Sequence, residues 1–487
     1  MSNLQVDYSR KWYVMAAVSM GTLLATIDSS IVNVALPTLV RDLNTDFATV
    51  QWVVLAYLLT LATLVLSTGR LADMIGKKPI FMLGFVIFTI GSVLCGLASS
   101  IYMLIGFRVV QAIGATMILA LGMAIVTESF PPEERGLALG TSGTMVSIGI
   151  VIGPTLGGLI IDALTWHWIF FVNLPIGILG IFMVIRYVPA IKPEGKQRFD
   201  FPGAITLFLC LLTFLSALTL GQNIGFIELR VLILLVISIT FLAAFIYVEK
   251  HTIQPMIDLS LFRNRLFSIN LITGFITFFA IAGALILMPF YLENVLGYST
   301  REVGLLIAAV PVSMGVIAPL AGWMSDHFGT RPITVIGLVI LLLGYGALST
   351  LNVMTSTIGY ILRFLPIGVG MGVFQSPNNS AIMGEAPRDR LGTVSGMLAV
   401  NRTLGQTTGI AVLGALWASQ ALMYAAPSSL ESATNAPTTA QVDALQDTFT
   451  AISVIILVAL GLAVWALVKE RKKHKSTRLD AKLTYPD

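Results

Sequence analysis

The sequence carries little charge for its length. Only 11% of its 487 residues are Asp, Glu, Lys or Arg, and 56% are hydrophobic, whereas soluble domains have about 25% charged and about 45–50% apolar residues. The mean hydropathy is +0.88. A chain with so few charged residues cannot cover a water-exposed surface of this size. The composition therefore argues against a soluble enzyme and indicates an integral membrane protein.

Cysteine, histidine and nucleotide-binding motifs are also scarce. Cys95 and Cys210 both lie in apolar runs, and the four histidines are scattered, so we expect neither a disulfide framework nor a metal site. The sequence has no Walker-type phosphate loop, so we expect neither ATP-driven work nor a cofactor. The formal net charge of +4 does not indicate nucleic-acid binding, because membrane topology accounts for the basic residues.

The chain consists mainly of apolar runs about 20 residues long, the length that crosses a hydrocarbon core about 30 Å thick. The runs are too long and too continuous for barrel strands, so they predict helices. The first run starts at Trp12 and is too long for a cleavable signal, so we expect it to remain as an anchor. The predicted spans are Trp12–Leu36, Thr49–Gly69, Pro79–Ser99, Ile101–Thr127, Leu137–Leu164, Trp168–Val188, Pro202–Gly221, Leu229–Glu249, Phe267–Leu292, Glu302–Ser325, Pro332–Leu351, Ser356–Ser380, Leu391–Ala418 and Phe449–Val468.

Basic residues orient these fourteen spans. With the amino terminus in the cytoplasm, every Lys and Arg outside the spans falls on the inner side except Arg41, Arg230 and Arg301, as the positive-inside rule requires. Both termini are therefore expected in the cytoplasm. The long outer segment Ser419–Thr448 is rich in Ala, Ser, Thr and Pro, and it is either an unstructured connector or a small ordered lid.

A weak internal repeat divides the chain. The segment Gly69–Pro79 resembles Gly322–Pro332 at an offset of 253 residues, and Arg108 corresponds to Arg363 at an offset of 255. The motif Pro-x-x-Arg at Pro132 recurs at Pro387 at an offset of 255. We predict two six-helix halves, 1–198 and 259–487, with two inserted helices in 199–258. Parallel repeats about an axis along the membrane normal are typical of secondary transporters.

Four motifs carry a family resemblance. They are the inner-loop motif Gly69–Pro79, in which Met74 replaces a usual basic residue, the first-span signature Ile27–Pro37, the fifth-span motif Gly149–Gly158 and the entry to span 6, Trp166–Gly177. Together they resemble the major facilitator superfamily, and specifically its fourteen-span drug:proton antiporter branch. The resemblance implies an all-α membrane fold of two six-helix bundles plus two inserted helices, with no enzymatic activity.

Asp28 is the first candidate for chemistry, because an ionisable side chain inside a span is costly and usually functional. Arg108 lies at a similar distance from the outer surface, so the two side chains can pair. We expect Asp28 to take up a proton when the central cavity faces outward and to lose it when the cavity faces inward or when a cationic substrate competes. A permanent structural pair of Asp28 and Arg108 is the alternative.

Two further groups of residues have expected roles. Charge pairs at the inner surface could latch the two halves, or they could be only topogenic; these residues are Gly69, Asp73, Gly76, Lys77, Lys78, Glu128, Asp326 and Arg331. Small residues let one helix approach another closely, so the fifth-span motif is expected either to seal the cavity or only to pack helices. Its residues are Gly149, Gly153, Pro154, Gly157 and Gly158.

The cavity wall is expected to combine aromatic, Met and amide side chains, which suit varied lipophilic cations, although each of them could instead serve ordinary packing. The candidates are Asn33, Tyr57, Met117, Phe278, Phe279, Gln375, Asn378 and Asn401. Glu293 is either a second acidic site or an interfacial charge. Arg402 lies inside a span and needs a partner or water that the sequence does not identify.

These features predict a proton-coupled exporter of lipophilic, cationic drugs or toxic compounds that works by alternating access. We expect it in a bacterial cytoplasmic membrane, embedded in the bilayer as a monomer, driven by the proton gradient, with protons and amphipathic small molecules as its partners. An exporter of one endogenous metabolite is the first alternative. A polytopic membrane enzyme is the second, but it would need a cluster of His, Asp or Glu at one membrane face.

Overall fold

The structure is a computed structural model, and it describes residues 10–131, 134–190, 200–252, 259–385, 391–425 and 432–484. The side chains of Asp73 and Asp326 lie outside the part of the molecule that it describes. Every regular element in the described ranges is helical. This confirms the expected all-helical fold class.

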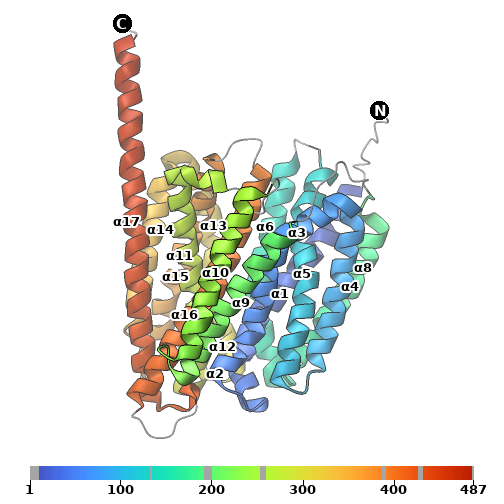
Figure 1. Ribbon diagram of the computed structural model, residues 1–487, viewed down its shortest axis with the longest axis vertical. Coiled ribbons are helices and arrows are strands. Elements are labelled where there is room, and N and C mark those ends of the chain that lie inside the picture. Colours follow the sequence, from blue (N-terminus) through green and yellow to red (C-terminus); the bar gives the residue numbers. More distant parts are fainter. Residues whose placement is uncertain are drawn as a thin grey trace.

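The helices form three consecutive groups along the chain (Figure 1). The first half contains α1 (Lys11–Asp42), α2 (Phe47–Val50), α3 (Trp52–Ile75), α4 (Lys77–Gly96), α5 (Ile101–Ser129), α6 (Arg135–Ala163), α7 (Trp168–Phe171) and α8 (Asn173–Tyr187). The inserted pair is α9 (Phe201–Ile224) and α10 (Leu229–His251). The second half contains η3 (Leu259–Arg263), α11 (Arg265–Phe290), η4 (Tyr291–Val295), α12 (Thr300–Ile307), α13 (Ala309–Phe328), α14 (Thr330–Leu348), α15 (Thr357–Gly384), α16 (Leu391–Tyr424), η6 (Ala433–Asn435) and α17 (Thr438–Thr484).

Each predicted span coincides with one helix or with a consecutive pair, α7–α8 or α12–α13. Among the described residues, twelve helical segments are long and apolar enough to cross a membrane. The predicted spans over α6 and α16 are not among the twelve, and α6 contributes the shorter apolar helix Ile148–Ala163. Helix α1 begins and α17 ends at the same end of the bundle (Figure 1), as an even number of crossings requires. We call this the termini end and the opposite one the far end.

Two helices extend beyond their predicted limits at the far end. Helix α1 continues past Leu36 through Pro37 to Asp42, and α17 begins at Thr438, eleven residues before Phe449. Ala433 and Ala436, between α16 and α17, and Ala440, in the first turn of α17, are buried. The interpretation of Ser419–Thr448 as an unstructured connector is therefore wrong for its described residues. They form the end of α16, η6 and the start of α17, and we call residues 432–448 the cover of the far end.

The internal repeat is visible in the backbone. Gly76 ends α3 with φ 110° and ψ 145°, and Gly329 ends α13 with φ 88° and ψ 152°. Residues other than glycine rarely adopt such a positive φ. The two glycines are 253 residues apart and turn the chain in the same way from one helix into the next. The repeated sequence motif is therefore also a repeated structure.

The inserted helices α9 and α10 pack on each other, and α9 also contacts α3 of the first half and α16 of the second. The Trp52 indole nitrogen, at the start of α3, donates a hydrogen bond of 3.1 Å to Thr219 of α9. Helix α10 exposes large apolar side chains, such as Ile239 at 66%. The inserted pair thus lies along one side of the junction between the halves, with α10 positioned to face lipid.

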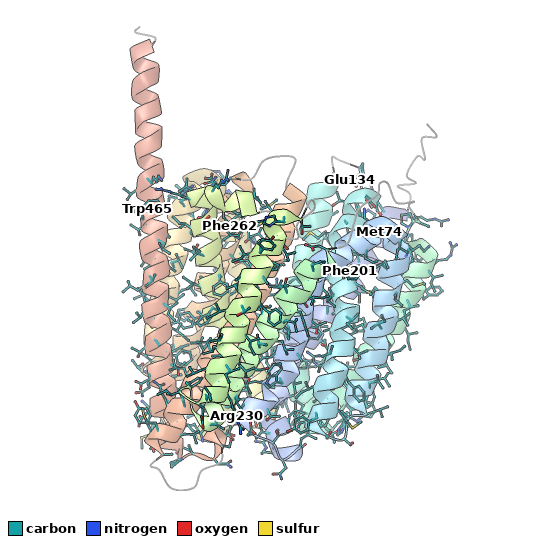
Figure 2. The ribbon with its side chains drawn as sticks, viewed as in Figure 1. Met74, Glu134, Phe201, Arg230, Phe262 and Trp465 are labelled. Atoms are coloured by element: carbon teal, nitrogen blue, oxygen red, sulfur yellow. The ribbon has the colours of Figure 1, made fainter. Side chains whose placement is uncertain are left out.

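Large apolar side chains are exposed on most of the helices, as a surface in contact with lipid requires. Figure 2 shows these side chains around the bundle, with Arg230 at the far end and Glu134 and Trp465 toward the termini end. The polar groups that are buried between the helices are consequently exceptional. They define the candidate functional site.

Candidate functional site

A buried charge pair lies in the first half. Arg108 of α5 donates from Nη1 to Oδ2 of Asp28 on α1 at 2.5 Å. Oδ1 of Asp28 accepts from Nε2 of Gln111 at 2.7 Å and from Nδ2 of Asn173 at 3.0 Å. The Asp28 side chain has no exposed surface. Three donors from α5 and α8 therefore surround this carboxyl group inside the helix bundle.

The guanidinium of Arg108 is held on all sides as well. Its Nε donates to the Val53 carbonyl of α3 at 3.1 Å, and its Nη1 also donates to Oε1 of Gln111 at 2.7 Å. The Tyr57 ring lies 4.2 Å from the guanidinium carbon, close enough for a cation–π interaction. Ser92 of α4 accepts from Gln111 at 3.1 Å and from Asn173 at 2.9 Å. We call Asp28, Ser92, Arg108, Gln111 and Asn173 the buried network.

The structure brings together the predicted pair of Asp28 and Arg108, as their matching depths suggested. Tyr57 was expected in the cavity wall. In the structure its ring lies against Arg108, and the residue is 1% exposed. Sequence reasoning overlooked Gln111 and Ser92, and it quoted Asn173 only as part of a motif. Gln111 lies three residues after Arg108, the spacing that places two side chains on one helix face, and this was the available signal.

The two halves touch at the far end. Arg41 at the end of α1 pairs with Glu293 of η4 at 2.9 Å. The Phe47 ring of α2 packs edge-on against the rings of Phe290 and Trp417, with centroids 4.9 and 4.8 Å away. Every ion pair, aromatic contact and close glycine contact given for the described residues that joins the halves lies at this end. The far end is therefore closed, and Glu293 forms an ion pair between the two halves there.

The fifth-span motif lies at this closure. A Cβ added at Gly149, Gly153 or Gly157 would collide with α1 at Thr26, Ser30 or Ile31, respectively. One added at Gly158 would lie 2.6 Å from the Thr300 carbonyl oxygen of α12, and one at Gly304 would meet the Pro154 carbonyl. The motif thus lets α6 approach α1 on one side and the second half on the other.

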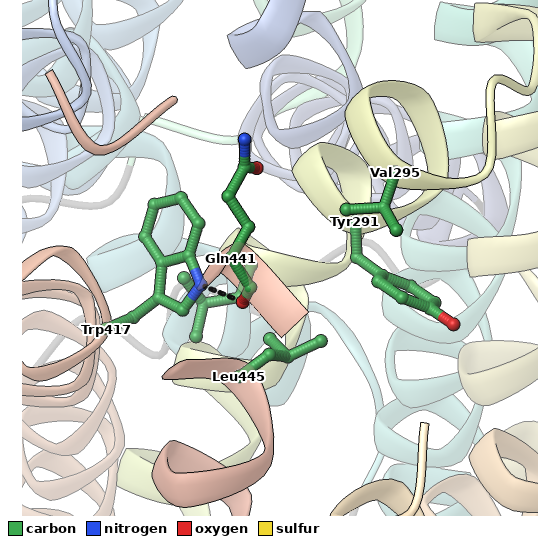
Figure 3. A pocket seen from close by; sticks show the side chains of 6 residues that line it. Tyr291, Val295, Trp417, Gln441 and Leu445 are labelled. Atoms are coloured by element: carbon green, nitrogen blue, oxygen red, sulfur yellow. Dashed lines mark hydrogen bonds between the residues drawn. The ribbon is translucent and has the colours of Figure 1, made fainter. Parts of the chain in front are cut away.

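A small pocket beside the closure is lined by Leu287, Tyr291, Val295, Trp417, Gln441 and Leu445. Figure 3 shows the Trp417 indole donating to the Gln441 carbonyl, at 3.1 Å. This bond ties the start of α17 to α16. The pocket belongs to the packing of the cover and holds no charged side chain.

The inner-loop residues pair within their own halves. Lys77 of α4 forms an ion pair with Glu128 at the end of α5, and Lys78 donates to the Ile185 carbonyl of α8 at 3.0 Å. In the second half, Arg331 of α14 pairs with Glu385, beyond α15, at 2.9 Å. Glu385 was not predicted, yet it repeats the position of Glu128. The Cβ position of Gly69 has open space around it, so the tight turn depends on Gly76.

The remaining cavity candidates fall into two groups. Phe279 and Asn378 are buried against neighbouring helices, at 9% and 2% exposure, so in this conformation they pack between helices. Partial exposure is shared by Asn33, Met117, Phe278, Gln375 and Asn401. Met117 contacts α4 at Gly84, and Asn401 donates to the Leu271 carbonyl of α11 at 3.0 Å. Their place in a substrate cavity stays a prediction.

Comparison with known proteins places this architecture in a family. The profile of the Major Facilitator Superfamily matches residues 18–410. The riboflavin transporter RibZ of Clostridioides difficile is 34% identical over 419 residues, which cover 85% of this chain and 90% of RibZ. The multidrug resistance protein Stp of Mycobacterium tuberculosis is 34% identical over 405 residues, which cover 83% of this chain and 75% of Stp.

A solved structure has the same fold. A bacterial homologue of the human lysosomal transporter Spinster superimposes with a TM-score of 0.66 at 19% identity, covering 94% of this chain and 97% of that one. The profile match over most of the chain and the similarity to these relatives agree with the repeated halves and the all-helical bundle. The chain belongs to the Major Facilitator Superfamily, and it is therefore a transporter of small molecules and not an enzyme.

Proposed function

We propose that this chain is a proton-coupled antiporter that exports amphipathic small molecules across a bacterial cytoplasmic membrane, with Asp28 as its proton site. The observation that carries the proposal is the completely buried ion pair of Asp28 and Arg108. Its position inside a predicted span makes a proton-binding role the natural assignment. In this proposal both termini and the inner-loop motifs lie in the cytoplasm. The chain crosses the bilayer fourteen times and works as a monomer.

The buried network links protonation to conformation. All three neighbours of the Asp28 carboxylate donate to it. A proton on Asp28 removes one acceptor and leaves the Arg108 charge buried without its counterion, which is strongly destabilising. The protonated state therefore favours another arrangement of α1 against α5, in which Arg108 finds new partners. In this way proton uptake drives the change between the two conformations.

The closure of the far end indicates which stage of the transport cycle this conformation represents. In the proposed orientation the far end is the outer one, so the structure corresponds to the inward-facing stage after proton release. Asp28 is then ionised and paired, and it reaches the outer proton only after the contacts at Gly158 and Glu293 separate. The fifth-span glycines act as the outer seal, and the pairs of Lys77 with Glu128 and of Arg331 with Glu385 stiffen the inner gate.

The protein could export either many different compounds or a single metabolite. Several multidrug resistance proteins among the relatives favour the export of varied lipophilic compounds. The riboflavin transporter, at equal identity, favours a single metabolite as the second candidate. A panel of structurally unrelated compounds separates the two, since a drug exporter moves many of them and a metabolite exporter moves one.

The decisive experiment reconstitutes the full chain in proteoliposomes with an acidic lumen and measures substrate uptake and proton efflux together. The wild type is expected to show both, and Asp28→Asn is expected to lose gradient-driven uptake while it still binds substrate. Gradient-driven uptake by Asp28→Asn at the wild-type rate would exclude Asp28 as the proton site.

A further inference from the structure

Arg402 is a charged side chain deep in the second half. It lies eleven residues after the start of α16 at Leu391, which is about 16 Å along the helix at about 1.5 Å per residue. This is about half of a hydrocarbon core about 30 Å thick. An arginine at this depth is costly and requires an anionic or strongly polar partner.

The partner is not supplied by the described residues. None of the hydrogen bonds and ion pairs given for them involves Arg402, whose side chain is partly exposed. Asp28, in the interior of α1, is already paired with Arg108. Glu128, Glu293 and Glu385 are occupied by other basic residues. The guanidinium of Arg402 therefore has no carboxylate neighbour there.

Helix geometry shows which side of α16 carries Arg402. Successive residues are about 100° apart round a helix, so Gly409 and Leu413, seven and eleven residues further on, lie within about 20° of Arg402. Gly409 lies against the backbone of Phe279, and Leu413 lies against Gly283, both in α11. Arg402 therefore lies on the side of α16 that faces α11.

Spare amide groups lie beside it. The Nδ2 atoms of Asn378 and Asn401 both lie within 3.3 Å of the point where a Cβ at Gly274 would be. Asn378 donates to the Asn270 carbonyl at 3.1 Å, which joins α15 to α11. Nδ2 of Asn270 and Oδ1 of Asn378 are buried without a hydrogen-bond partner. An unsatisfied buried amide is costly, so this cluster retains unused hydrogen-bonding capacity.

An aromatic wall completes the site. A Cβ at Gly405, one turn beyond Arg402, would lie 3.0 Å from Cβ of Phe278. The rings of Phe275 and Phe279 stack next to this position, with centroids 6.4 Å apart. A planar guanidinium binds carboxylate or phosphate oxygens in a fork, and aromatic side chains accept a flat apolar body. The cluster thus suits one molecule that has both features.

We propose that Arg402 binds an anionic group of the transported compound, so that the substrate is an amphipathic organic anion with an aromatic body. This inference rests on the proposed transport function and names the charge of its substrate. It replaces the positive charge expected from the sequence, because the acidic side chain that would meet a cation at this depth, Asp28, is fully buried. Asn270, Asn378 and Asn401 position the helices around the bound anion.

The test uses two probes with the same xanthene ring system and opposite charge. Carboxyfluorescein is an anion and rhodamine 123 is a cation. Uptake of each into proteoliposomes with an acidic lumen is measured by filtration, extraction and quantification for the wild type, Arg402→Gln, Arg402→Lys and the control Arg363→Gln. Arg363, at the far end of α15, bonds Thr350 and the Gly359 carbonyl, so its variant removes an arginine charge outside the proposed site.

The wild type is expected to move carboxyfluorescein. Arg402→Gln should reduce its rate at low concentration at least about tenfold, the loss of one charged hydrogen bond, while Arg402→Lys and Arg363→Gln keep more of it. Melting curves in detergent show whether each variant is folded. If Arg402→Gln is not folded, the uptake of carboxyfluorescein by Arg402→Lys is the test of the inference. Selective uptake of rhodamine 123, or wild-type kinetics for carboxyfluorescein in Arg402→Gln, overturns the inference and leaves the transport function intact. Gradient-driven uptake of neither probe by the wild type refutes the inference and the proposed function together.

Discussion

Asp28 and Arg108 in the first half are enclosed by donors and acceptors from α1, α3, α5 and α8, whereas Arg402 in the second half has no carboxylate partner among the described residues. The sequence predicts that the two halves repeat one pattern, yet the first half has a completed ionic network and the second an incomplete one. A completed network can respond to a proton, because one added charge disrupts it. An incomplete one can respond to a ligand, because the ligand completes it. The comparison suggests a division of labour between coupling and binding.

The largest expected effect comes from breaking the buried pair. Asp28→Asn should abolish gradient-driven transport and lower stability by about 3–5 kcal/mol, because Arg108 is left buried without its counterion. Thermal unfolding in detergent and uptake into proteoliposomes measure the two effects. The double variant with Asp28→Asn and Arg108→Gln should recover most of the stability and none of the coupling. If the double variant regained gradient-driven transport, the pair would have only a structural role.

A smaller effect is expected at the closure. Gly158→Val should hold α6 away from Thr300 of α12, prevent the far end from closing, and reduce transport at least about tenfold, a barrier of about 1.4 kcal/mol. The accessibility of a cysteine introduced at Thr300 to a water-soluble thiol reagent should rise. Gly106→Val is the matched control, because a Cβ at Gly106 has no atom within 4 Å. Unchanged accessibility in Gly158→Val would mean that the motif does not form the seal.

Removal of one donor from the buried network should cost less than removal of the charge. Asn173→Ala takes one of three hydrogen bonds from the Asp28 carboxylate, and a hydrogen bond to a charged group contributes about 1.5–3 kcal/mol. Transport should fall by less than in Asp28→Asn, and the melting temperature should drop. Asn173→Asp provides the contrast, because it places a second carboxylate beside Asp28 and should be worse than Ala. Equal behaviour of Ala and Asp would argue against an ionised Asp28 in this conformation.

The smallest effect concerns the two inner ion pairs. Glu128→Gln should cost less than about 1 kcal/mol, because both partners are partly exposed and such pairs contribute little. Glu385→Gln should cost more, about 1–2 kcal/mol, since Arg331 is only 6% exposed and Asn264 also binds Glu385, at 2.8 Å. Chemical or thermal unfolding of both variants gives the order. A reversed order would show that the first-half pair has a role beyond stability.

The sequence was informative where a property is local or periodic. Runs of about 20 apolar residues define the helices, since unsatisfied backbone groups are excluded from hydrocarbon. The offset of 253 residues predicted two similar halves, and Gly76 and Gly329, which are separated by that offset, both have a positive φ. Asp28 and Arg108 were recognisable because isolated charges inside spans are rare. Helix limits were less accurate, because Pro37 is accommodated within α1 and the cover before Phe449 is helical.

The buried network could be predicted only in part. Gln111 and Ser92 are ordinary residues in apolar helices. Their role arises because α5 and α8 place amides against the Asp28 carboxylate and α4 places Ser92 against those amides. Glu385 became a counterpart of Glu128 only once α14 and α15 were placed side by side. Tyr57 resembled a cavity residue by type and position, and packing alone placed it against Arg108.

The sequence by itself indicated a membrane protein, predicted a repeated half with an inserted pair of helices, and identified which charges lie inside the apolar spans. Composition, run length and spacing carry that information because each helix must satisfy its own backbone in lipid. Only the tertiary structure decided which charges meet, which end is closed and which arginines inside the predicted spans have no carboxylate partner among the described residues. Those properties depend on how helices distant in sequence rotate and approach one another, and no single segment encodes them.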